Sequence, residues 1–178
     1  MTYEVDDPVS GQRVVFDEPN PAALELDLYV QPGAFVREHF HPSQHETFAV
    51  VEGTFHASID GKTHKIEPGE SMTVAPGTKH GFRPAPEAVH MRVTVTPALR
   101  LEMYFRAFLG LSRDHRLIMP PDGFPKPLLQ FAVIMDEFNA ELAAPGFPLF
   151  VQRPTWWLLA RVGALKGYRR HLPEYGVF

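Results

Sequence analysis

The sequence of 178 residues contains no cysteine, which excludes disulfide bonds and thiolate metal ligands. It also lacks the ~20 consecutive uncharged residues that a membrane-spanning helix needs, because Arg153, Arg161 and two prolines interrupt its most apolar stretch, 147–165. The N-terminal residues are acidic and precede no apolar run, so we expect no signal peptide and a cytoplasmic protein. No basic run is interleaved with stacking aromatic residues, and we expect no nucleic-acid partner.

Alternation of apolar and polar residues dominates the first half of the chain. Residues 23–30 and 88–96 alternate with a period of two, which is typical of strands with one buried and one solvated face. Asp60-Gly61 predicts a two-residue type I′ hairpin between two such segments. About nine short strands are expected, which favours a mainly β, antiparallel sandwich or barrel. Their ranges are 11–16, 23–30, 35–41, 46–52, 54–59, 63–66, 69–74, 81–86 and 88–96.

The pattern changes after Pro97. Residues 1–97 carry 7 Lys and Arg against 14 Asp and Glu, whereas residues 98–178 carry 10 against 7. Dense apolar residues without strand alternation predict three helices, at 98–112, 128–144 and 155–168. We therefore expect a β-barrel over 1–97 and a C-terminal helical extension over 98–178, packed on the barrel or on a dimer partner.

The third predicted helix has an unusual composition. From Arg153 to Arg170 there are five basic residues and no acidic one, beside Trp156 and Trp157. Docking of its Trp-Leu-Leu face on the barrel or on a second subunit is the favoured interpretation. The alternative is contact with an anionic membrane surface, which helices of this composition can make.

Histidines and one glutamate concentrate in residues 33–53. If 35–41 is a strand, His39 and His41 leave the same face, and the next strand would direct Glu46 back toward them. Neutral imidazoles with a carboxylate suit a divalent transition metal such as Fe, Mn, Ni, Cu or Zn. A further ligand is then expected, and His80, which follows a Pro-Gly turn and opens the next strand, is the candidate.

The spacing of these residues resembles the two sequence motifs of the cupin family, over roughly residues 11–97. The first motif is matched by Gly33, His39, His41, Glu46 and Gly53, and the second by Gly69, Gly77 and His80. Ala75 stands where the family usually has proline, and Pro84 where it usually has asparagine. The chain is similar to single-domain bacterial cupins of the cupin 2 type with a C-terminal helical extension.

This resemblance implies an antiparallel jelly-roll β-barrel and a homodimer. It implies that His39, His41, Glu46 and His80 are the ligands of a divalent transition metal. Neither departure from the motifs touches a ligand. The family includes dioxygenases, isomerases, epimerases, decarboxylases and binding proteins, so the resemblance alone does not choose a function.

Four further residues are candidates for substrate binding. Phe35, Phe48 and Phe82 are expected to line an apolar pocket inside the barrel, although inward aromatic side chains can equally be core. Arg37 would share the face of His39, where a buried guanidinium would bind an anionic group such as a substrate carboxylate. The favoured interpretation is that Arg37 lies at the barrel rim and points to water instead.

Strand alternation directs His45 away from the face that carries Glu46, and the alternative that it assists Glu46 stays open.

Our leading hypothesis is a metal-dependent oxygenase that acts on a small, apolar or aromatic molecule. The second is a non-redox isomerase, cyclase or decarboxylase in which the metal is a Lewis acid; His45, or His90 with a reversed register, would have to be its base. The third is a binding protein with a structural metal.

Overall fold

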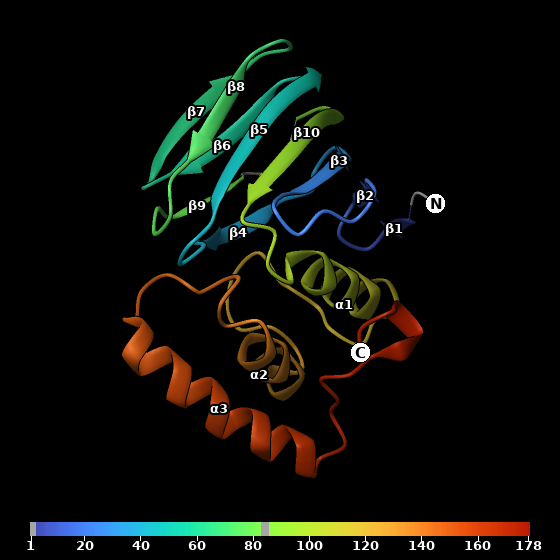
Figure 1. The fold of residues 1–178 in the computed structure, drawn as a ribbon, viewed down its shortest axis with the longest axis vertical. Helices are drawn as coiled ribbons and strands as arrows, with labels where there is room; N and C mark the ends of the chain where they lie inside the picture. The colour runs from blue at the N-terminus through green and yellow to red at the C-terminus, as the bar shows by residue number, and fades with distance from the viewer. Residues whose placement is uncertain (1–2, 83–85) are drawn as a thin grey trace.

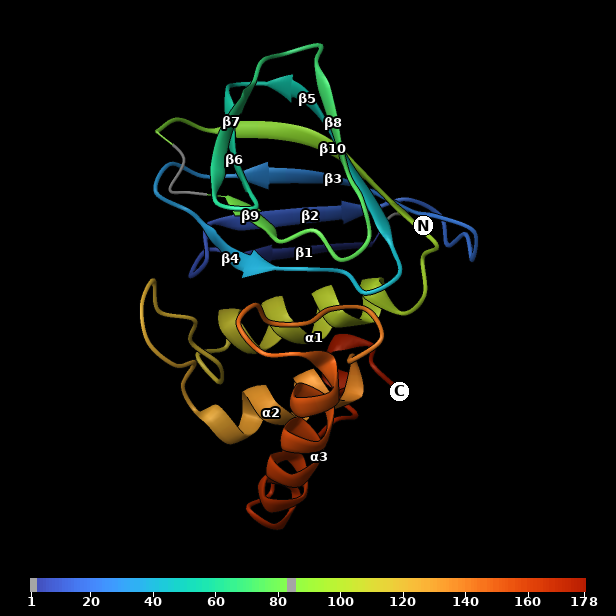
Figure 2. The same cartoon turned by 90° about the vertical axis from the view of Figure 1, so that its left-hand side faces the viewer.

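The computed structural model describes residues 3–82 and 86–178. Its β part consists of two antiparallel sheets, and three helices lie beyond one end of them (Figures 1 and 2). The larger sheet has the order β1 (Tyr3–Asp7), β2 (Gln12–Phe16), β3 (Leu24–Val30), β10 (Val89–Thr96), β5 (His45–Glu52), β8 (Ser71–Val74). The smaller has the order β4 (Val36–His39), β9 (His80–Phe82), β6 (Phe55–Ile59), β7 (Lys62–Ile66).

This architecture confirms the mainly β, jelly-roll expectation, although no strand ladder joins the two sheets within the described ranges. The Asp60-Gly61 turn is also confirmed, because both residues have positive φ and Ile59 pairs with Lys62 across them. Strand β1 was not predicted; its inward residues, Val5 and Asp7, alternate with exposed ones. The strand expected over 81–86 and the departure at Pro84 extend into residues outside the described part of the chain.

The strands bury one continuous apolar core between the sheets, to which helix α1 (Leu101–Arg113) also contributes. Leu101 and Leu109 belong to that core, whereas Ala107 and Leu111 belong to a second core shared with helix α2 and the C-terminal residues. Helix α1 therefore connects the β part to the other helices by burying apolar residues on both sides of its axis. The division at residue 97 stays a prediction.

Helix α2 (Leu128–Glu137) ends earlier than the predicted 128–144. The residues that follow it form a turn and then an isolated bridge in which Ala143 pairs with Phe40. Both backbone hydrogen bonds of this bridge are made, at 3.0 and 2.9 Å. A tertiary contact with the β part thus takes the backbone groups that a longer helix would have used internally.

Helix α3 (Leu149–Leu165) begins earlier than predicted, and Pro154 lies inside it rather than before it. Proline removes one helical hydrogen bond, and Pro154 is on the solvent side of the helix, where water can satisfy the freed carbonyl. Ala160 and Gly163 face α2 instead. A Cβ atom at Gly163 would lie 2.9 Å from Val133 Cγ2, so the glycine allows the two helices to approach closely.

Within the described residues, the Trp-Leu-Leu face does not dock on the barrel, which was one of its two predicted positions; docking on a second subunit stays a prediction. Trp156 packs edge-on against Phe131 of α2, with ring centroids 5.7 Å apart. Trp157 and Leu158 are exposed, and α3 forms the outermost layer, with α2 between it and the sheets (Figure 1). Within the described ranges, no helix combines the length and apolar character needed to cross a membrane.

Candidate metal centre

Four side chains converge where the two sheets meet the helical layer. His39 ends β4, His41 follows it, Glu46 lies in β5 and His80 opens β9. One ligand atom from each side chain lies within 4.8 Å of those from all the others. His41, Glu46 and His80 are buried, and His39 is partly exposed. The smaller sheet and the turn after β4 thus supply the three imidazoles, and the larger sheet supplies the carboxylate.

The three imidazole rings are held in one tautomer by backbone carbonyl groups. Nδ1 lies 3.0 Å from the Arg37 carbonyl oxygen in His39, 2.5 Å from that of Glu141 in His41, and 2.9 Å from that of Thr78 in His80. A carbonyl oxygen only accepts hydrogen bonds, so each Nδ1 carries the hydrogen and donates it. In the neutral rings, every Nε2 then presents a lone pair, the arrangement that a metal-binding histidine requires.

The local electrostatics fit this arrangement. Burial, followed by the charges of His80 and His41, lowers the pKa of His39 to about 3, so this ring is neutral near pH 7. Burial opposes ionisation of Glu46, but His41 and His80 outweigh it and hold its pKa below the ordinary value. Burial also lowers the pKa of His41, but Glu46 and the Glu141 carbonyl raise it more, for a net increase.

The atoms at the centre require a cation. Glu46 Oε2 lies 2.8 Å from His80 Nε2 and 3.3 Å from His41 Nε2, and His41 Nε2 is buried without a hydrogen-bond partner among the described residues. With Nδ1 donating, an uncharged ring would direct its Nε2 lone pair at an anionic oxygen. A proton or a metal ion has to separate them, and three imidazoles with one carboxylate suit a divalent transition metal.

Strand β4 corrects one expectation about this face. Val36 pairs with Phe82 and His39 with His80, so three steps along β4 match two steps along β9. This bulge places Val36, rather than Phe35 and Arg37, on the face of His39, because a bulge shifts the alternation by one residue. Arg37 is exposed and donates a 2.6 Å hydrogen bond to the Gly123 carbonyl oxygen.

The candidate pocket residues are only partly brought together. Phe48 packs edge-on near His80, with ring centroids 6.3 Å apart, and therefore borders the metal centre. Phe82 packs against Phe55, which in turn packs against Phe48, with ring centroids 5.6 and 5.3 Å apart. Phe35 is half-buried. Substrate binding by these residues stays a prediction, in which Phe48 is the best-placed candidate.

The two histidines considered as bases lie outside the centre. His45 is exposed on β5, as strand alternation predicts. His90 stacks on Tyr29 at 4.2 Å, and its Nε2 contacts Asp27 Oδ1 at 2.8 Å. The inward residues of β10 are its neighbours Val89 and Met91, so the register is not reversed.

Sequence reasoning missed two groups that support the ligands. The Glu141 carbonyl holds His41 from 100 residues away, and nothing in the sequence indicates that contact. Gln44 lies between the ligands His41 and Glu46, and its buried side chain donates to the carbonyl oxygens of Pro97 and Ala98 at 2.8 and 3.1 Å. Its position between two ligands was the available signal. The helical layer thus contributes directly to the metal centre.

Known proteins share parts of this chain. An oxidoreductase of Arthrobotrys oligospora is 24% identical over 147 residues, 78% of this chain and 58% of that protein. A Penicillium expansum protein named "Probable oxidoreductase patJ" is 27% identical over 77% of this chain and 44% of its own length. The chain therefore spans about half the length of these curated relatives.

A solved structure described as an RmlC-like cupin, from Shewanella frigidimarina, superposes with a TM-score of 0.50 at 26% identity. The superposition covers 55% of this chain and 86% of that one. Residues 27–97 match the family model described as "Cupin domain". These residues contain all four members of the His and Glu cluster, so the part of the chain that holds the candidate metal centre is the part that matches a cupin domain.

Proposed function

We propose that this protein is a metal-dependent oxidoreductase, and specifically an oxygenase that acts on a small apolar or aromatic molecule. One observation carries the proposal: three buried or half-buried imidazoles donate Nδ1 to backbone carbonyl groups and direct Nε2 toward a carboxylate. Such a ligand set suits a redox-active divalent metal such as Fe, Mn or Cu.

When bound, the metal would supply the electron transfer between an organic substrate and O2. His39, His41, Glu46 and His80 would hold the metal. Glu46, ionised by its histidine neighbours, would lower the net charge of the centre, and the three carbonyl contacts would keep the rings from rotating.

The surroundings favour an apolar substrate. Phe48 and Phe55 pack against each other beside His80, and such a wall excludes water from one side of the centre. Arg37 is exposed and donates its hydrogen bond to the Gly123 carbonyl oxygen, so its guanidinium is not expected to bind a substrate carboxylate at the metal. The names of the two fungal relatives add weight to redox chemistry, although the chain matches only about half of each protein.

The Lewis-acid alternative, in which the metal polarises a carbonyl group for isomerisation, cyclisation or decarboxylation, needs a base beside the substrate. The two histidines considered for that role, His45 and His90, both lie outside the centre. A purely structural metal is disfavoured because structural metal sites are usually closed to solvent, whereas His39 in this cluster is partly exposed. A homodimer stays a prediction from the family resemblance.

The first test is elemental analysis of the purified protein, followed by oxygen-electrode measurements on the Fe(II), Mn(II) and Cu(II) forms with phenols, diketones and small acids. We expect near-stoichiometric metal and substrate-dependent O2 uptake. Substrate turnover without O2 uptake would refute the oxygenase and favour the Lewis-acid alternative. A metal-free protein that takes up none of these ions would refute the metal centre.

Ligand variants locate the site. His41→Ala and His80→Ala should each lose most of the bound metal while keeping the far-UV circular dichroism of the fold. His45→Ala is the matched control, because it removes an exposed imidazole next to a ligand. If His45→Ala empties the site while Glu46→Ala does not, the assignment of the carboxylate is wrong.

A further inference from the structure

The outer face of α3 is apolar and uncovered. Phe150, Trp157, Leu158 and Leu165 are seven, eight or fifteen residues apart, or adjacent, which places them on one side of the helix. Exposed Phe147 lies just before the helix begins. The exposed fractions of these residues run from 49% for Trp157 to 88% for Leu165. Within α3 only Gln152, Ala160 and Gly163 are buried, and they lie on the opposite side. We call the five exposed residues the α3 apolar face.

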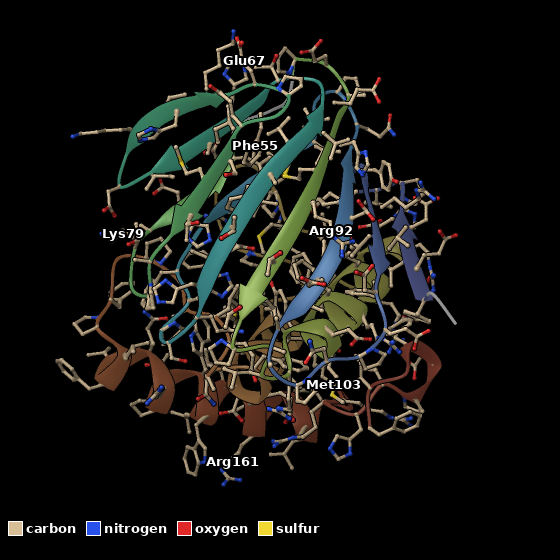
Figure 3. All side chains as sticks on the ribbon, turned by 45° about the horizontal axis from the view of Figure 1, so that its top comes forward. Phe55, Glu67, Lys79, Arg92, Met103 and Arg161 are labelled. Carbon is tan, nitrogen blue, oxygen red and sulfur yellow. The ribbon has the colours of Figure 1, made fainter. Side chains whose placement is uncertain are left out.

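Positive charge surrounds this face. Between Glu141 and Glu174 there is no acidic residue, and there are five basic ones: Arg153, Arg161, Lys166, Arg169 and Arg170. Arg161 lies over the Trp157 ring at 3.9 Å and points away from the body of the protein (Figure 3). Arg170 approaches Asp136 and Glu137 of α2 at 3.7 and 3.5 Å, whereas Arg153 and Lys166 form no ion pair within the described ranges.

This charge pattern discriminates between occupants. If a second copy covered the face across a two-fold axis, it would repeat the same surface. Arg153 and Arg161 of each copy would then meet a face with no acidic residue, and like charges would repel. An anionic phospholipid surface offers negative charge for the arginines and an apolar layer for the phenylalanine, tryptophan and leucine side chains.

The shape of the surface fits the same occupant. The α3 apolar face is one side of a 17-residue helix that forms the outermost layer of the protein, so it can lie flat on a membrane. Aromatic residues and arginine are the side chains that settle at the boundary between headgroups and acyl chains. The β part, with its excess of acidic residues, lies on the far side of α2 and would face away from the lipid.

We propose that α3 is a peripheral membrane anchor that lies in the surface of an anionic bilayer through Phe150, Trp157 and Leu158, with Arg153, Arg161 and Lys166 at the headgroups. This surface is separate from the metal centre, and its function does not depend on the proposed oxygenase activity.

The test is co-sedimentation of the full chain with vesicles of phosphatidylcholine that contain phosphatidylglycerol, against vesicles of phosphatidylcholine alone. We expect binding to the anionic vesicles that weakens with added salt, and little binding to the neutral ones. Phe150→Ser should reduce the apparent affinity by roughly tenfold. The matched control is Phe124→Ser, which removes a phenylalanine of similar exposure (75% against 79%) away from α3 and should bind like the unmodified chain.

A second pair of variants examines charge. Lys166→Gln should weaken binding to anionic vesicles, whereas Lys62→Gln, an exposed lysine on β7, should not. Absence of binding to anionic vesicles, or an equal loss with Phe150→Ser and Phe124→Ser, would overturn the proposal. Analytical sedimentation without vesicles tests whether a second copy of the chain covers the α3 apolar face. A stable dimer that dissociates in Phe150→Ser would also overturn the proposal of a membrane anchor.

Discussion

The bridge between Phe40 and Ala143 offers the sharpest perturbation of the metal centre that leaves every ligand in place. Phe40 immediately precedes the ligand His41, and Ala143 lies two residues after Glu141, whose carbonyl accepts the Nδ1 hydrogen of His41 at 2.5 Å. The two backbone hydrogen bonds of the bridge, 3.0 and 2.9 Å long, therefore fix both partners of that contact. Ala143→Pro removes the donor of the second bond.

The expected cost to stability is about 1–3 kcal/mol, the range for a carbonyl group that loses its partner. The effect on metal binding is separate. Loss of the groups that orient a metal-binding imidazole typically reduces affinity by about 10- to 100-fold. We expect Ala143→Pro to weaken metal binding within that range because His41 would lose the carbonyl that holds its Nε2 toward Glu46. Urea unfolding measures the first effect, and titration against a competing chelator measures the second.

Ala75→Pro is the matched control. Ala75 is exposed and follows β8, and the preceding strand residue, Val74, has the extended conformation that a following proline favours. We expect the metal affinity of this variant to be unchanged and its stability to be equal or slightly higher. If Ala143→Pro is destabilised as expected but binds metal as tightly as Ala75→Pro, the helical layer does not position His41.

Three further predictions concern the scaffold. Gly163→Ala should lower the free energy of unfolding by about 1–2 kcal/mol, since its Cβ would lie 2.9 Å from Val133 and this overpacking outweighs the helical preference for alanine; unchanged urea unfolding would contradict the close α2–α3 packing. The Arg92 hydrogen bond lowers the pKa of Asp17, so its stabilisation is present above the unfolded-state pKa and lost as pH falls through the folded-state pKa. Asp17→Asn should then cost about 0.5 kcal/mol at pH 7, a small value because the pair is partly solvated, and nothing once the carboxyl is protonated; an undiminished cost in acid would contradict the pairing. Arg37→Gln should change stability by less than about 1 kcal/mol and leave metal content unaltered, whereas metal loss would show that Arg37 supports the centre.

The ligand set and most of the strands could be predicted from local sequence. Alternation with a period of two reports burial on one face of a strand, and the histidine and glutamate spacing is set by strands and turns only a few residues long. His39, His41 and Glu46 lie within eight residues of one another, so their convergence depends on a single turn. His80 could be added because it follows a Pro-Gly turn and, by resemblance, completes the second motif.

Local patterns failed wherever a distant segment decided the geometry. Strand β4 has one more residue than β9 between their paired positions, and this bulge turned Phe35 and Arg37 away from the face of His39. The bulge is visible only in the pairing of the two strands. Pairing with Phe40 ended α2 at Glu137 rather than at Ala144, because backbone groups satisfied by a tertiary bridge no longer favour another helical turn. The predicted start of the third helix after Pro154 was also wrong, because Pro154 lies on the solvent side of α3, where water can satisfy the carbonyl group that loses its helical hydrogen bond.

The sequence by itself determined the kind of domain, the residue types of the metal centre and the acidic and basic halves of the chain, because these follow from short spacings and composition. Only the tertiary structure decided how the rings are oriented, which face of α3 stays uncovered and that the helical layer reaches His41. Those features depend on contacts between segments up to 100 residues apart. Every residue has a backbone carbonyl group, so the residue type at position 141 does not indicate that its carbonyl binds His41.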